Sequence, residues 1–181
     1  MDYRRFYQLE SYLFEEVRAR FASNGALDAF DFFCIVVWKA NRAKSTVAKN
    51  LLKHGDASLE DAVRTLTAGI AARSNPKDRM IYLLNEWGLR LPMASAILTV
   101  LYPDDFTVYD TRVCDTLGQF HNLNNLTSSE KAWEGYAQFK AAVASAAPAD
   151  LSLRDKDRFL WGKSFQEQLR DDINASFHRD H

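Results

Sequence analysis

The apolar residues of this chain recur mostly at intervals of three and four positions, as they do along one side of an α-helix. Stretches in which apolar and polar residues alternate, the pattern of a half-buried strand, are few. Residues that interrupt helices are also scarce, with 7 Gly and 4 Pro in 181 residues. The pattern therefore predicts an all-α protein, with helices over about 3–21, 27–38, 44–54, 91–101, 111–119 and 152–169.

One further helix has clear sequence signals at both ends. Asn75 can cap it, because the side chain of an N-terminal Asn accepts a hydrogen bond from a free backbone amide. Pro76 suits the first turn, where its missing N–H costs nothing. We expect this helix to end before Gly88 and to bury Ile81, Leu84 and Trp87.

Two short segments have the pattern of a capping box, in which Ser or Thr is followed three residues later by an acidic residue. They are residues 58–61 and 127–130, and each predicts the start of a helix, the second of which runs to about residue 146. Residues 106–110 lie between two helical patterns and are expected to form an extended link.

The length and composition fit a single soluble helical domain over residues 1–181. Acidic residues interrupt the N-terminal apolar positions, so we expect neither a secretory signal nor a membrane span, and we expect a cytoplasmic monomer. Cys34 and Cys114 have no further Cys or His at the spacing of metal ligands. We therefore expect no metal site and interpret both cysteines as small core residues.

The net charge of −1 does not favour binding to nucleic acid, whose affinity comes largely from Lys and Arg at phosphates. The charge is, however, unevenly distributed. Residues 32–55 contain no acidic residue, and the segment of about 38–54 carries Lys39, Arg42, Lys44, Lys49 and Lys53. This segment is either a basic face for DNA or an ordinary solvated helix face.

Residues 76–101 have the pattern of two helices joined by a tight turn after Gly88. The second helix begins with small residues, Ala94, Ser95 and Ala96, which let two helices approach closely. Because the first amides of a helix have no partner within it, its N-terminus attracts anions such as phosphate. Such a hairpin can hold a DNA backbone without reading the base sequence.

Downstream of this hairpin the resemblance to a family becomes specific. The run ASAIL at 94–98, the Pro103–Asp104 turn and the run FTVYDTRV at 106–113 resemble the helix-hairpin-helix DNA glycosylase superfamily. In that superfamily a GVGxxxA hairpin is followed, about 16 residues after its alanine, by the catalytic aspartate, and Ala94 to Asp110 is this interval. The resemblance is close over residues 88–117, looser over 32–52, and includes a closing helix at 153–161.

The resemblance implies a helix-hairpin-helix glycosylase-like fold and base excision from double-stranded DNA, in DNA repair or in antiviral defence. The target base would be flipped out, and Asp110 would stabilise the oxocarbenium-like sugar or orient a water molecule. Substrate contacts are expected from Trp38, Lys39 and Asn41, and DNA contacts from Arg42, Lys44, Gly88, Arg90, Leu91, Met93 and Arg112. No cofactor is expected, with a monovalent or divalent cation at the hairpin left open.

The sequence departs from the family pattern at three points. Arg90 replaces the second hairpin glycine, so the turn could differ and contact phosphate through a side chain. Pro92 stands where bifunctional members carry a Schiff-base lysine, which predicts a monofunctional enzyme. The four cysteines of iron–sulfur members are absent. Lys39 remains an alternative amine nucleophile.

Each of these residues also has a structural interpretation. Asp110 could simply cap a helix, Trp38 could belong to the core, and Arg112 could pair with a carboxylate or assist Asp110. Trp87 and Trp161 are both expected in the core. The alternative functions are a non-catalytic helix-hairpin-helix DNA-binding module and a helical protein-interaction domain. The base that would be recognised is not specified by the sequence.

Overall fold

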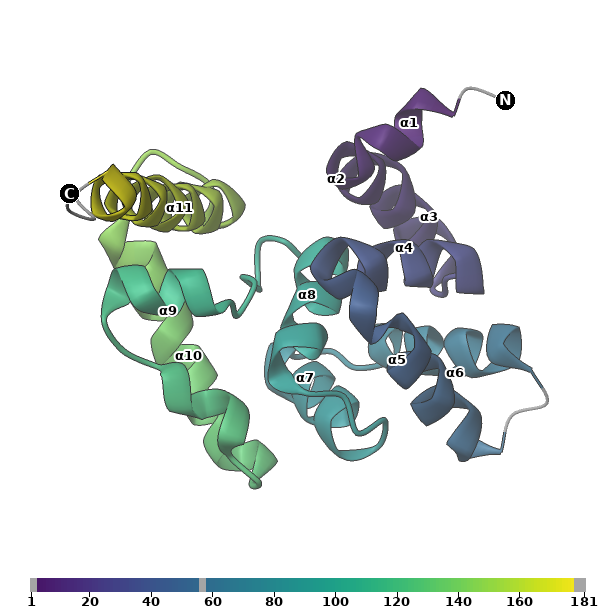
Figure 1. The fold of residues 1–181 in the computed structure, drawn as a ribbon. Helices are drawn as coiled ribbons and strands as arrows, with labels where there is room; N and C mark the ends of the chain where they lie inside the picture. The colour runs from purple at the N-terminus through teal and green to yellow at the C-terminus, as the bar shows by residue number, and fades with distance from the viewer. Residues whose placement is uncertain (1–2, 56–57, 178–181) are drawn as a thin grey trace.

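The computed structural model describes residues 3–55 and 58–177, and within these residues all regular structure is helical (Figure 1). The prediction of an all-α protein is therefore confirmed at the level of fold class. The first half of the chain forms α1 (Arg4–Tyr7), α2 (Leu9–Ser11), the π-helix η1 (Tyr12–Val17), α3 (Arg18–Asn24), α4 (Ala29–Ala40), η2 (Asn41–Ala43), α5 (Lys44–Leu51), η3 (Leu52–His54) and α6 (Leu59–Ala71).

The second half contains the longest helices. Its elements are α7 (Pro76–Asn85), α8 (Leu91–Leu101), α9 (Thr111–Leu117), the 3₁₀ segment η4 (His121–Asn125), α10 (Ser129–Ala146) and α11 (Leu153–Phe177). In Figure 1, α8 lies between the group formed by α9, α10 and α11 and the helices of the N-terminal half. Among the described residues, no helix is both long and apolar enough to cross a membrane.

The core is centred on α8. All of its residues except Pro92 are buried, and it packs against α4, α7 and α3. A helix that is apolar on every side must be surrounded by other elements to remove that surface from water. Because α8 is fixed from several sides, it gives a rigid base to the segment that follows it.

Of the caps predicted at Ser58, at Asn75 and in the segment 127–130, the first two are confirmed at the predicted residue. The Ser58 hydroxyl accepts the amide of Asp61 at 3.1 Å, and Asn75 Oδ1 accepts the amide of Asp78 at 2.9 Å. At the third site the cap is Ser128, whose hydroxyl is 3.4 Å from the Lys131 amide, and not Thr127. A run of adjacent hydroxyl residues leaves the register of a cap undetermined by one position.

The prediction of one continuous N-terminal helix over residues 3–21 was wrong. The segment 3–21 is broken at Gln8, which is not helical, and continues through the π-helix η1 into α3. Tyr12 in η1 is buried, and its hydroxyl donates to the buried carboxylate of Asp31 at 2.7 Å. Tyr12 in this π-helix is thus tied to α4 by a polar contact between residues 19 positions apart, which no local pattern contains.

The buried stripe of α7 also differs from the prediction. Met80, Tyr82 and Leu83 are buried, whereas Ile81 and Leu84 are only half-buried. Trp87 is buried as predicted, at 4% exposure. Because α7 packs against α6, α8 and α10 at once, its buried face is set by three neighbours, and a single amphipathic stripe does not describe it.

Helix α11 extends to Phe177, eight residues beyond the predicted end near residue 169. Leu160 and Ser164 are buried on one side of it, but Trp161 is 43% exposed, so the placement of Trp161 in the core was wrong. Cys114 is buried as expected, whereas Cys34 is only half-buried. Of the four histidines, His178 and His181 lie outside the described residues.

Candidate functional site

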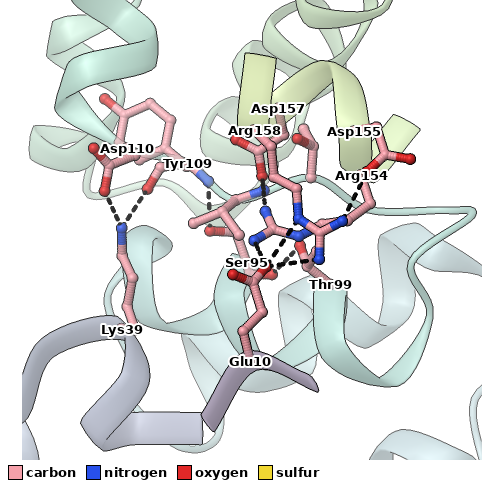
Figure 2. A network of polar contacts seen from close by, with 12 residues as sticks. Glu10, Lys39, Ser95, Thr99, Tyr109, Asp110, Arg154, Asp155, Asp157 and Arg158 are labelled. Carbon is pink, nitrogen blue, oxygen red and sulfur yellow. Dashed lines mark hydrogen bonds and ion pairs between the residues drawn. The ribbon is translucent and has the colours of Figure 1, made fainter. Parts of the chain in front are cut away.

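Asp110 is the N-cap of α9 and also the partner of Lys39. Its Oδ1 accepts the amide of Arg112 at 3.0 Å, and its Oδ2 lies 2.5 Å from Lys39 Nζ. The lysine also donates to the carbonyl oxygen of Tyr109 at 3.4 Å (Figure 2). The side chain of Asp110 is 26% exposed and that of Lys39 is 11% exposed. The carboxylate therefore caps a helix and still faces solvent.

The link that carries Asp110 is held by side chains from three helices. The amides of three consecutive residues, 107–109, each donate to a buried side-chain oxygen. The pairs are Thr107 with Tyr136 of α10 at 2.9 Å, Val108 with Asp157 of α11 at 3.3 Å, and Tyr109 with Ser95 of α8 at 2.9 Å. The backbone leading to Asp110 is thus fixed residue by residue.

Sequence reasoning missed Ser95, Tyr136 and Asp157 as residues that position the site. A signal existed for Ser95 and Tyr136, which are polar residues in largely apolar helices, whereas Asp157 stands in the charged run 154–158; the structure buries each of the three at 2% exposure or less. Buried polar groups are almost always hydrogen-bonded, since an unsatisfied one is costly. Without the fold, however, their common partner could not be named.

A cavity of about 520 Å³ opens beside Asp110 and Lys39. Four of the predicted site residues line it together: Trp38, Lys39, Asp110 and Arg112. A second cavity of about 290 Å³, which includes Pro92 and His121 in its lining, also touches both Lys39 and Asp110. The ion pair therefore lies at the boundary between two hollows. Asn41 and Arg42 line neither cavity.

The wall opposite the ion pair is charged but internally paired (Figure 2). Arg154 binds both Glu10 and Asp157, and Arg158 binds Glu10 at 3.0 Å. Burial raises the pKa of Asp157, an effect that Arg154 opposes. Burial also acts to raise the pKa of Glu10, but the two arginines outweigh it, so the pKa of Glu10 is lowered.

Trp38 is half-buried and lines the cavity with part of its ring. It meets Phe14 edge-on, with ring centroids 5.8 Å apart, and the guanidinium carbon of Arg154 is 5.2 Å from the Trp38 ring centroid. The ring is thus both a core contact and a cavity wall. Stacking of a base on Trp38 stays a prediction. The base would share the ring with the guanidinium of Arg154, which already contacts it.

Arg112 points toward α11 and not toward the Asp110 carboxylate. Its Nη1 donates to Gln168 Oε1 at 2.6 Å, and its guanidinium carbon lies 5.3 Å from the Trp161 ring centroid. Only its backbone amide contacts Asp110, and the cation beside that carboxylate is Lys39. Of the roles that the sequence left open for Arg112, pairing of its side chain with Asp110 is not seen, and a contact with DNA stays a prediction.

The hairpin between α7 and α8 turns at Gly88, which has a left-handed φ of 59°. Arg90 has a φ of −76°, a value open to any residue, so the arginine causes no strain there. The Arg90 side chain is exposed, whereas those of Leu91 and Met93 are buried. The Met93 amide already donates to the carbonyl of Arg90 at 3.0 Å. Phosphate binding here stays a prediction, and it would use Arg90 and free backbone groups.

The predicted basic face is exposed. Arg42, Lys44, Lys49 and Lys53 all have exposed side chains, and Lys44 donates to Asn41 Oδ1 at 3.2 Å. Exposure is compatible with a DNA face and with a solvated face alike. Asn41 was expected to contact the substrate, but it lies next to this basic face and lines neither of the cavities at Asp110.

In the parts of the chain that the structure describes, no group of three or more His, Cys, Asp or Glu side chains is placed to hold a metal ion. Comparisons of this chain with protein-family models, with curated proteins and with solved structures give no match. Any assignment of function therefore rests on the geometry around Asp110 and on the sequence motifs that predicted it.

Proposed function

We propose that the chain is a DNA glycosylase that hydrolyses the N-glycosidic bond of a base flipped into the 520 Å³ cavity. The observation that carries the proposal is the position of Asp110. Its carboxylate is partly exposed at the cavity, fixed by its own helix cap and by Lys39, and reached through a backbone link that three helices hold.

The chemistry follows from this fixed carboxylate. When a glycosidic bond breaks, positive charge develops on the sugar, and a carboxylate already in place can stabilise that charge or orient the attacking water. Preorganisation matters because a group held by other contacts pays little to reorganise during the reaction. The cavity has room for a nucleobase, since ligand pockets of about 300–1,000 Å³ are usual for small molecules.

Lys39 has a positioning role in this mechanism. Its ammonium contacts the same oxygen that would face the sugar, so it holds the carboxylate in one orientation until a substrate enters. An incoming phosphate is a suitable new partner for an ammonium displaced in this way. The lysine would then add to the grip on the DNA backbone.

A covalent route through Lys39 is the second candidate, and the observation behind it is that Lys39 lies at the cavity in contact with a carboxylate that can accept its proton. Asp110 would accept a proton from the ammonium, and the free amine would attack C1′ while the base departs with the bonding electrons and takes up a proton. Ring opening would give a Schiff base, and water would release the abasic sugar and the amine. The lysine would come from α4 and not from the hairpin, where Pro92 stands.

The test is base release from DNA duplexes that carry a panel of modified bases, with the free bases identified by mass spectrometry. Asp110→Asn is the informative variant, because Asn can still cap α9 while losing the negative charge. We expect it to lower base release by about 100-fold or more. Asp115→Asn, which alters an exposed carboxylate of the same helix, is the matched control and should change little.

Unchanged release by Asp110→Asn would remove Asp110 from the mechanism. A wild-type chain that binds duplex but releases no base from any substrate would instead be a DNA-binding module. The observation that favours this alternative is that both oxygens of Asp110 already have partners within the protein.

A further inference from the structure

One side of α11 presents aromatic side chains that have no core role. Trp161 and Phe165 are 43% and 45% exposed, while Asp157, Leu160 and Ser164 on the adjoining side of the helix are buried. The two rings are four residues apart and therefore neighbours on one face. They lie parallel within 8°, with centroids 5.7 Å apart. Exposed, parallel aromatic rings are costly to leave in water, which points to a ligand.

One arginine lies against both rings. The guanidinium carbon of Arg112 is 5.3 Å from the Trp161 centroid and 5.7 Å from that of Phe165. Gln168 fixes this guanidinium by accepting a hydrogen bond at 2.6 Å. Arg158, three residues before Trp161 on the same helix, is 47% exposed but is paired with Glu10 and Asp155, so the charge at the rings is that of Arg112. The face therefore combines flat apolar surface with positive charge.

The face is also continuous with the candidate active site, because Trp161, Arg112 and Arg158 line the same cavity as Asp110. Aromatic rings beside arginines bind unpaired nucleotides, since a base can stack on a ring while its phosphate meets a guanidinium. A base inside a duplex cannot stack in this way, because its faces are covered by neighbouring base pairs.

We propose that Trp161, Phe165 and Arg112 form a binding face for unpaired nucleotides of the DNA strand whose base occupies the cavity. This inference rests on the proposed function and makes it more specific. The substrate class is DNA with a single-stranded stretch beside the target base, and fully paired duplex is the poorer ligand.

The experiment compares a short fluorescein-labelled oligo-dT strand with the same strand paired to oligo-dA, by fluorescence anisotropy with the full chain. We expect tighter binding of the single strand. Trp161→Ala and Phe165→Ala should each weaken that binding roughly fivefold or more, the range expected for losing one stacked base. Their effect on duplex binding should be smaller, and Trp161→Phe should retain most of the affinity because a ring remains.

The chain offers a closely matched control. Phe159 is 45% exposed on the same helix and lies two positions before Trp161, so it is on a different side. Phe159→Ala should leave single-strand affinity unchanged. Because all three rings are exposed, the substitutions remove little core contact, and thermal unfolding measured for each variant verifies this.

Equal losses for single strand and duplex, or an equal effect of Phe159→Ala, would overturn the inference. So would sedimentation showing a dimer that Phe165→Ala dissociates, because the face would then be covered by a second copy of the chain. Failure of the proposed function gives a different result: single-strand binding would depend on Trp161 while no base is released from any DNA. Base release from fully paired duplex at unchanged rates in Trp161→Ala would leave the glycosylase proposal standing and this inference refuted.

Discussion

The two oxygens of Asp110 have different partners, and this division explains why the structural and catalytic interpretations of that residue are compatible. Oδ1 accepts a hydrogen bond from the Arg112 amide, as the oxygen of a capping aspartate does, whereas Oδ2 contacts Lys39 at the cavity. A substitution that removes the charge but keeps the cap separates the two functions. A substitution of Lys39 addresses the remaining contact.

Lys39→Met keeps the length of the side chain and removes its charge. We expect base release to fall about tenfold or more, because Asp110 loses the contact that orients it. Lys39→Arg should restore part of the activity, since a cation again reaches the carboxylate. Lys131→Met, in an exposed lysine outside both cavities, is the control and should leave base release close to that of the wild type.

Borohydride added during base release distinguishes the two roles proposed for Lys39, positioning of Asp110 and nucleophilic attack on the sugar. Hydrolysis through Asp110 leaves no covalent species to trap, and we expect none. A borohydride-stabilised adduct with DNA that is present in the wild type and absent in Lys39→Met would replace the positioning role with a nucleophilic one.

At the scale of elements, the extended link 106–110 determines where Asp110 lies. The hydroxyl of Tyr136 makes two of its contacts, accepting the Thr107 amide at 2.9 Å and donating to the Thr107 carbonyl at 2.7 Å. Both bonds are buried, so no water can replace them without a change in packing. Besides the ring contacts of Phe106 with Tyr136 and of Tyr109 with Phe139, the link is thus hydrogen-bonded to α10 through one oxygen atom.

Tyr136→Phe tests this dependence because it removes only that oxygen. The Thr107 amide and carbonyl would be left buried without their partner, and we expect the free energy of unfolding to fall by about 1–3 kcal/mol. Urea denaturation measures the change. Tyr7→Phe, at a position that is 93% exposed, is the control and should change stability by less than about 0.5 kcal/mol. A stability equal to that of the wild type would show that the link is held in other ways.

Some parts of this architecture could be predicted from local sequence and others could not. The helical class, the caps at Ser58 and Asn75 and the helix start after Asp110 depend on residues a few positions apart, so local rules found them. The pairing of Lys39 with Asp110 joins residues that are 71 positions apart, and it depends on how α4 packs against the link. No periodicity encodes that distance.

The errors have the same origin. Trp161 was expected in the core because large aromatic residues are usually buried, but α11 is covered on one side only, by α9 and α10. Which side is covered depends on the neighbours and not on the helix itself. The exposed face formed by Trp161, Phe165 and Arg112 therefore could not be predicted from the sequence.

At the scale of the whole molecule, an early helix and the start of the last helix, α2 and α11, meet beside the cavity. Glu10 of α2 accepts hydrogen bonds from Arg154 and Arg158 of α11, residues 144 and 148 positions away. Closing a loop over so long a segment costs more chain entropy than closing a local contact, although that cost rises only slowly with length. These hydrogen bonds join the first helices to the wall of the candidate site.

The pKa of Glu10 makes this connection sensitive to pH. The arginines hold the pKa of the folded carboxyl below its ordinary value of 4.5, against the opposing effect of burial. A lowered pKa in the folded state means that the stabilising contribution is present above about pH 4.5 and is lost as the pH falls through the folded value. The pKa of Asp157 is raised by burial, so its contribution has the opposite sign and decreases as the pH rises through its folded value.

Glu10→Gln isolates the first of these contributions. At neutral pH we expect the variant to be less stable than the wild type, by about 1 kcal/mol or less because the Glu10 side chain is 37% exposed and solvent screens the pair. The difference should shrink as the pH falls below about 4.5 and vanish once Glu10 is protonated, since both proteins then carry an uncharged side chain at this position. Urea unfolding at a series of pH values measures this difference in stability.

The control is Glu167→Gln, which alters an exposed carboxylate 3.9 Å from Lys163 within α11 and should show no comparable dependence on pH. A Glu10→Gln difference that stays constant into acid would mean that the side chain contributes through packing and not through its charge.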